Sequence, residues 1–227
     1  MDIEERIKNC EIFSKQIKQY DPDPFYVNHF FGKFIDSVNG VFDGIFEEAN
    51  RDFGLFIIKK ISENEFREKS KNKNDQNAIK FSEWYSIKFM QEHTNPYPDV
   101  IKKICQFKNK FNKLPEIKIM IRAMDRYKGD VNQQIKVNLS SDKIRSKEEL
   151  DIEIKRQLPI FLEIINYKRN KENEPNVKNN QIIASAFLDI GEHRDIEISY
   201  ASEIYIPVMK RLVKESRIKI KELTTWK

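Results

Sequence analysis

The segment at residues 24–53 constrains the fold of this chain more than any other. Its apolar side chains recur every three or four positions, at Val27, Phe31, Phe34, Val38, Phe42, Ile45 and Ala49. This spacing puts them on one face of an α-helix, where they need cover from other elements. Asp23 is a favoured N-cap, Pro24 suits the first helical position, and Gly54 is typical of a helix end. The segment predicts a long, buried helix.

Further amphipathic patterns predict helices on both sides of this segment, at about residues 3–20, 79–90 and 99–111. Between them, the run from Ser62 to Asn77 is polar and lacks an apolar period, so we expect an exposed loop there. The buried face expected on the third helix consists of Ile79, Trp84, Ile87 and Phe89 or Met90. The first half of the chain therefore reads as helical.

The periodicity changes after residue 115. Apolar and polar residues alternate at 116–123 and again at 135–139, with turn-forming residues at 128–130, which predicts a hairpin. Ile182 to Ile190 is apolar enough for a buried strand, and 195–200 reads either as a strand or as the start of a helix. Helices are expected at about 146–167, after a capping-box sequence, and at the C-terminus, with Pro207 in the first turn.

These patterns predict an α+β fold with two regions. Residues 1–114 form a helical region, and residues 115–227 form a mixed region with a small, mostly antiparallel sheet and two helices. The two regions could also make one integrated domain, because 227 residues are compatible with either arrangement.

Composition limits the classes of function. Charged residues make up 34% of the chain, but the net charge is only +5, which permits a polyanionic partner without requiring one. The two cysteines are far apart, so we expect no disulfide framework and no cysteine-based metal site. The N-terminal residues do not resemble a signal peptide, and no apolar run is long enough for a membrane span. We expect a cytoplasmic protein without a cofactor.

Known catalytic motifs are missing from the sequence, so we favour a protein that is not an enzyme. The sequence has no phosphate-binding loop, no nucleophile elbow and no paired metal-ligand spacing. Of the three histidines, His29 suits a structural role, and His93 as a cation would suit a helix C-terminus. His193 lies beside Glu192 in a dense polar cluster, which is ordinarily a charged hairpin tip. A hydrolase or nuclease site assembled there by the fold is an alternative.

Two lysine-rich helices favour a second alternative, a protein that binds nucleic acid. Cationic side chains that repeat along a helix can follow a phosphate backbone. The candidate contacts are Lys102, Lys103, Lys108, Lys110, Lys210, Arg211, Lys214 and Arg217. A solvated helix face is the ordinary explanation for such residues.

Gly40 and Gly44 mark a candidate partner interface on the long helix. Glycine inside a helix costs about 1 kcal/mol relative to alanine, so two on one face suggest close approach by another helix or a second subunit. A tolerated weakness or a local kink would also explain them. Our leading hypothesis is a non-enzymatic interaction or regulatory protein, with a homodimer through this face as one arrangement.

The segment from Asp23 to Phe56, DPFYVNHFFGKFIDSVNGVFDGIFEEANRDFGLF, resembles the long core helix of HEPN-type helical domains. Ribonucleases of that superfamily carry an arginine followed by a histidine after four to six intervening residues. No arginine stands at that spacing before His29, His93 or His193. The resemblance therefore implies a member without the nuclease motif and transfers no catalytic residue.

Overall fold

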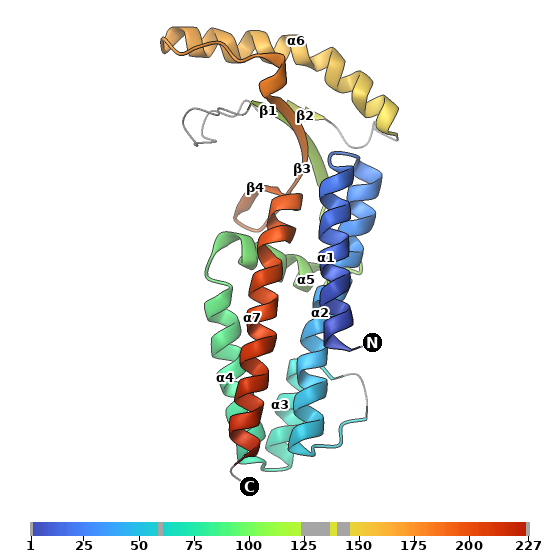
Figure 1. Ribbon diagram of the computed structural model, residues 1–227, viewed down its shortest axis with the longest axis vertical. Coiled ribbons are helices and arrows are strands. Elements are labelled where there is room, and N and C mark those ends of the chain that lie inside the picture. Colours follow the sequence, from blue (N-terminus) through green and yellow to red (C-terminus); the bar gives the residue numbers. More distant parts are fainter. Residues whose placement is uncertain (1, 59–60, 124–136, 140–145, 226–227) are drawn as a thin grey trace. The chain divides into compact units, whose positions relative to one another are not determined.

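The computed structural model describes residues 2–58, 61–123, 137–139 and 146–225 (Figure 1). The chain forms two compact units. The first comprises residues 1–15, 31–114 and 200–227, and the second comprises residues 16–30 and 115–199. The expected boundary after residue 114 coincides with one end of the second unit. The C-terminal helix, however, belongs to the first unit, and residues 16–30 belong to the second.

The helices and strands make an α+β fold, as predicted. The helices are α1 (Ile3–Tyr20), α2 (Pro24–Phe53), α3 (Glu63–Asn72), α4 (Gln76–Glu92), α5 (Pro96–Phe111), α6 (Lys147–Lys171) and α7 (Ile198–Thr224). The strands are β1 (Ile117–Ala123), β2 (Val137–Leu139), β3 (Ile182–Ile190) and β4 (His193–Glu197). None of the helices in the described ranges combines the length and the apolar composition of a membrane-spanning segment.

The core of the first unit forms around α2. Phe31, Phe34 and Val38 have no exposed surface, which confirms the helical stripe. Further along α2, the ring of Phe46 lies 5.4 Å from that of Phe66 and 4.7 Å from that of Tyr85, measured between centroids. Contacts between aromatic rings at these distances stabilise a core beyond the area they bury.

The loop expected between Ser62 and Asn77 is wrong, because most of this segment is the helix α3. Ser62 Oγ accepts the backbone N–H of Glu65 at 3.3 Å, and the Glu65 carboxylate accepts the backbone N–H of Ser62 at 3.0 Å. This capping box starts the helix. Only Phe66 and Ser70 of α3 are buried, so the segment shows too few apolar residues to reveal its period.

The buried face expected for α4 is also wrong. Phe81 and Tyr85 are buried, whereas Ile87 and Met90 are 60% and 71% exposed. Apolar residues occur on both sides of α4, and the side with the larger aromatic rings packs into the core. Pro207 likewise lies well inside α7, which begins at Ile198, and not in its first turn.

In the second unit, four strands form an antiparallel sheet in the order β2-β1-β3-β4. The buried strand expected at 182–190 is confirmed as β3, which pairs with β1 in a register that sets Ser185 opposite Met120. The strand expected at 195–200 starts earlier, at His193, and gives way to α7 at Ile198. The turn expected at 128–130 lies outside the described residues.

The helix α6 packs beside this sheet in the second unit (Figure 1). The hydroxyl of Ser146 accepts the backbone N–H of Glu149 at 3.2 Å, which caps α6 as predicted. Leu150, Phe161 and Ile165 form its buried face. Proline 159 interrupts only one backbone hydrogen bond, and the helix continues to Lys171, beyond the expected end at about 167.

Candidate functional site

Asp21 lies in the short turn between α1 and α2, and its side chain contacts β3 and the start of α7. Its Oδ1 accepts the backbone N–H of Ala186 at 2.7 Å, and its Oδ2 lies 3.5 Å from the hydroxyl of Ser199. The backbone N–H of Asp21 donates to Ile17 O at 2.9 Å, so the last turn of α1 positions the residue. All these residues belong to the second unit.

Glu197 and Arg122 complete a polar cluster around Asp21. The Arg122 guanidinium forms an ion pair with Glu197 and lies 5.2 Å from the centroid of the Phe187 ring. Burial is the main cause that raises the pKa of Asp21 to about 7, and the nearby Glu197 carboxylate adds to this effect. The Ala186 N–H and the Arg122 charge act in the opposite direction. Asp21 therefore changes its protonation near neutral pH.

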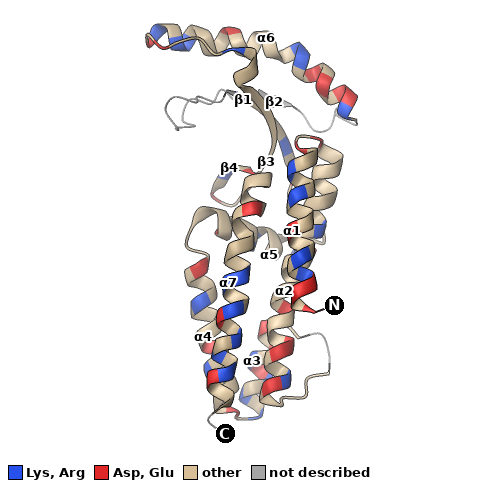
Figure 2. Ribbon diagram, in the orientation of Figure 1, with Lys and Arg blue, Asp and Glu red and all other residues tan. Residues whose placement is uncertain are grey.

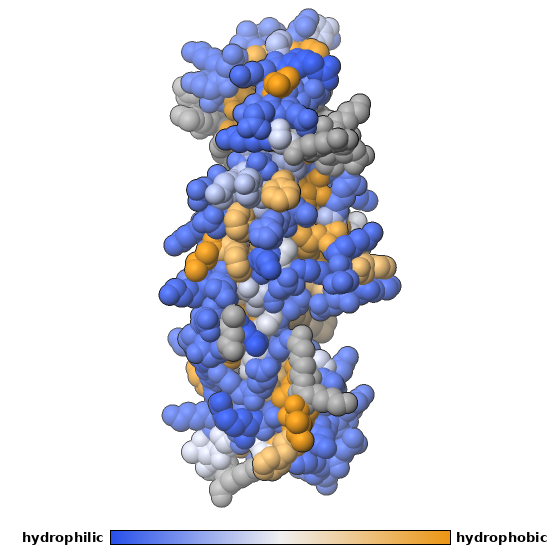
Figure 3. Space-filling view, turned by 90° about the vertical axis from the view of Figure 1, so that its right-hand side faces the viewer, coloured by the Kyte–Doolittle hydropathy of each residue, from blue (hydrophilic) through white to orange (hydrophobic). Residues whose placement is uncertain are grey.

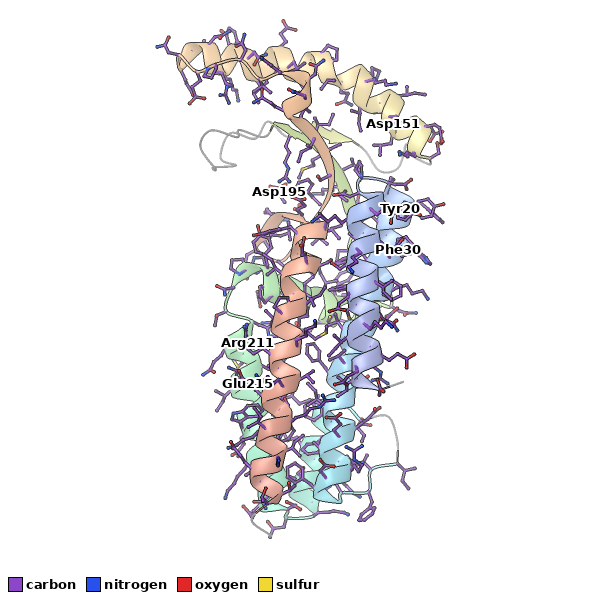
Figure 4. All side chains as sticks on the ribbon, viewed as in Figure 1. Tyr20, Phe30, Asp151, Asp195, Arg211 and Glu215 are labelled. Atoms are coloured by element: carbon purple, nitrogen blue, oxygen red, sulfur yellow. The ribbon has the colours of Figure 1, made fainter. Side chains whose placement is uncertain are left out.

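A cavity of about 500 Å³ opens next to Asp21. This volume falls in the range typical of ligand pockets. Its lining comes from the α1–α2 turn and the first turns of α6, which contribute Gln19, Tyr20, Asp21, Pro22, Asp23, Phe25, Tyr26, Ser146, Lys147, Glu148, Leu150 and Asp151. Figure 4 labels Tyr20 and Asp151, one from each side of the cavity.

Aromatic rings form one wall of this cavity. The rings of Tyr20 and Tyr26 stack with their centroids 4.6 Å apart, and Phe30 stacks on Tyr20 at 5.5 Å. Phe25 meets Tyr26 edge to face at 5.3 Å and is exposed. Such rings offer both apolar surface and the electron-rich faces that attract cations.

Carboxyl groups supply most of the charge around the cavity. Asp23 is buried, and its Oδ1 accepts the backbone N–H groups of Phe25 and Tyr26, which confirms it as the N-cap of α2. Hydrogen bonds at the start of α6 lower the pKa of Glu148, so its carboxylate stays ionised. Together with Asp21 and the exposed Asp151, these groups outnumber the single lysine of the lining. The cavity is therefore acidic and aromatic.

Most of the cationic side chains proposed to contact nucleic acid form ion pairs within the first unit. Figure 2 shows basic and acidic segments interleaved along α4 and α7. Lys214 is exposed, and Lys110 lies over the ring of Phe111 at 5.1 Å. The ion pairs are Lys102 and Lys103 with Asp99, Lys108 with Asp36, Lys210 with Glu11, Arg211 with Glu92, and Arg217 with Glu4 and Glu48.

Gly40 and Gly44 contact α1 of the same chain. A Cβ atom at Gly44 would lie 2.6 Å from Ile3 Cγ1, and one at Gly40 would lie 3.2 Å from Arg6 Cδ. The Arg6 guanidinium also donates a hydrogen bond to the carbonyl of Gly40. The close approach that these glycines permit is thus made by α1, which occupies the place that we expected for a partner helix.

His193, the centre of the expected hydrolase or nuclease site, lies at the start of β4. Its Nε2 is 3.6 Å from Glu192 Oε1, and the neighbouring Asp189 accepts the backbone N–H of Asp195 at 2.9 Å. The cluster is the tip of the β3–β4 hairpin. In the second unit it offers ordinary turn contacts, and a catalytic role for His193 stays a prediction.

His93 is a buried structural residue of the first unit. Its Nδ1 lies 2.6 Å from Phe89 O and its Nε2 lies 2.7 Å from the Tyr205 hydroxyl. Because a carbonyl can only accept, Nδ1 carries the proton and Nε2 accepts from Tyr205. Burial lowers the pKa of His93, so the ring is neutral and the cationic role expected for it is wrong. His29 is exposed beside Phe30.

The patterns in the sequence do not single out the Asp21 cluster. Asp21, Arg122 and Glu197 are distant along the chain, and only the pairing of β3 with its neighbours brings them together. One local signal was available, since Tyr20, Phe25 and Tyr26 flank a turn with two aspartates. No family model matches the chain, and no curated protein or solved structure is similar to it. The HEPN-type resemblance stays a prediction.

Proposed function

We propose that the chain is a non-enzymatic interaction protein whose second unit binds a cationic group in the cavity beside Asp21. The cationic group is a lysine or arginine side chain of a partner protein. The observation that carries this proposal is the lining itself, which combines three aromatic side chains with four carboxyl groups and one lysine. Ammonium and guanidinium groups are stabilised by both kinds of neighbour.

The contacts around the cavity favour binding over catalysis. Asp21 accepts a backbone N–H, Asp23 caps α2, and the Ser146 hydroxyl caps α6. These side chains are held in place by the fold, as a recognition site requires. Within the described lining, no hydroxyl or thiol stands beside a histidine that could activate it.

Calorimetric titration of the full chain with a tri-lysine peptide tests this function. We expect the peptide to bind and its lysine-acetylated form to bind at least tenfold more weakly, because acetylation removes the charge. Phe25→Ala removes an aromatic face and Asp151→Asn removes a carboxylate, so each should weaken binding by roughly fivefold, or about 1 kcal/mol.

Glu163→Gln provides the matched control, since this exposed carboxylate lies on α6 outside the cavity. It should leave the affinity unchanged. Equal binding of the acetylated peptide, or affinity that survives both cavity substitutions, would refute a cation site. The alternative, nucleic-acid binding through α5 and α7, stays a prediction, and the ion pairs of those helices argue against it.

A further inference from the structure

The helix α6 is apolar on two opposite faces. One face packs into the second unit through Leu150, Phe161 and Ile165, which are at most 2% exposed. The other face is open. Its large apolar side chains are Ile152, Ile160, Ile164 and Tyr167, with exposed fractions of 66%, 59%, 43% and 62%. Figure 3 shows apolar atoms at the surface where α6 lies, at the top of the view.

The four exposed side chains form one stripe. At 3.6 residues per turn, their positions fall within roughly a third of the helix circumference. Burying one such side chain is worth about 1.5–3 kcal/mol, so a contiguous stripe left in water marks an interaction surface. This stripe lies on the side of α6 opposite Leu150 and Phe161, and the exposed Phe25 of the cavity is not part of it.

The charges along α6 indicate what covers this stripe. Glu148 and Glu149 stand in its first turn, and Lys168 and Lys171 stand in its last turn. The ammonium of Lys171 lies 4.6 Å from the ring centroid of Tyr167, which puts a cation at one end of the stripe. Two copies of α6 in antiparallel orientation would set the acidic end of each beside the basic end of the other. A parallel pair would set like charges together.

We propose that the protein forms a homodimer through an antiparallel pair of α6 helices. Ile160 and Ile164 lie near the middle of the pair, where each contacts the same residues of the other copy across a two-fold axis. Glu149 of one copy then lies near Lys171 of the other. This interface differs from the Gly40 and Gly44 face, and it does not depend on the binding of a cationic group.

The first experiment is sedimentation equilibrium of the full chain over a wide range of micromolar concentrations. We expect a monomer–dimer equilibrium for the wild type. Ile160→Lys should weaken association at least tenfold, since it places two ammonium groups near the axis of an apolar contact. Ile218→Lys is the matched control, because Ile218 is an exposed isoleucine on α7, and it should leave association unchanged.

Charge reversal tests the orientation. Glu149→Lys and Lys171→Glu should each weaken the dimer, and the double substitution should restore it, because the pair of opposite charges is rebuilt between copies. Circular dichroism shows whether each variant remains folded. A wild-type chain that stays monomeric, a dimer indifferent to Ile160→Lys, or association with lipid vesicles in place of self-association would overturn the proposal.

Discussion

Asp21 shows how one buried carboxyl group can make the second unit sensitive to pH. Its ordinary pKa is 3.8, and burial beside Glu197 raises the pKa in the folded chain to about 7. Between these values the folded chain holds a proton that the unfolded chain has released. The free energy of unfolding therefore falls as pH rises from about 4 to 7, and this contribution levels off above pH 7.

Asp21→Asn should remove this part of the pH dependence. The amide cannot ionise, but its oxygen can still accept the Ala186 N–H, so the contact to β3 is kept. From the two pKa values, the wild type loses about 4 kcal/mol between pH 4 and 7 through this group, and the variant should not. Denaturation with urea, followed by circular dichroism at several pH values, measures the difference.

Asp21 has charged neighbours that bound this prediction. Glu197 acts to raise its pKa and Arg122 acts to lower it, so the magnitude depends on their ion pair. The exposed Glu163 gives a control of the same chemistry, because Glu163→Gln should preserve the wild-type slope. If Asp21→Asn and wild type lose stability in parallel between pH 4 and 7, Asp21 is ionised throughout.

At the scale of single elements, the contact between α1 and α2 depends on which glycine is considered. Alanine is the better helix former by about 1 kcal/mol, so both positions would gain from substitution if space allowed. At Gly40 a new Cβ meets the flexible Arg6 side chain at 3.2 Å. At Gly44 it meets the buried Ile3 at 2.6 Å, which is too close for any real contact.

Gly44→Ala should therefore destabilise the chain by about 1–3 kcal/mol, the usual cost of overpacking. Gly40→Ala serves as the matched partner and should be neutral or slightly stabilising, because the Arg6 side chain can shift. Thermal unfolding of both variants at one pH makes the comparison. Equal stability of the two would show that α1 does not hold Ile3 against α2 as described.

The elements that sequence patterns predicted correctly are those with strong local signals. The helix α2 has a long stripe, a cap at Asp23 and a terminal glycine at Gly54, whose φ is +67°. By contrast, α3 has only Phe66 and Ser70 buried, and its capping box at Ser62 and Glu65 was the one signal against a loop. A capping box carries more weight than the absence of an apolar period in a short helix.

The Asp21 cavity could not be predicted in the same way, because it depends on contacts between distant segments. The sequence around Asp21 predicts a helix end, and it reports nothing of Ala186 or Ser199 on the other side. The open stripe of α6 was hidden for a related reason. Apolar residues on two faces of a helix do not reveal which face is buried, and only packing against the sheet decides between them.

At the scale of the whole molecule, the basic residues carry less charge to the surroundings than their number suggests. The chain has 41 lysines and arginines against 36 aspartates and glutamates. Arg211 and Arg217 each contact carboxylates from other helices, and these contacts raise the pKa of both. Since paired charges cancel at a distance, we expect the wild type to bind polyanions weakly at physiological ionic strength.

Removing the partners of these arginines should strengthen polyanion binding. The double variant Glu48→Gln and Glu92→Gln leaves Arg211 and Arg217 with fewer carboxylates, so it should elute from heparin at higher salt than the wild type. Glu68→Gln with Glu163→Gln gives a control of equal net charge at exposed positions, and it should elute earlier than the first variant. Identical elution of the two variants would mean that net charge alone sets retention. Tight binding of wild type to duplex DNA at physiological salt, with a steep salt dependence, would instead favour nucleic-acid recognition by α5 and α7.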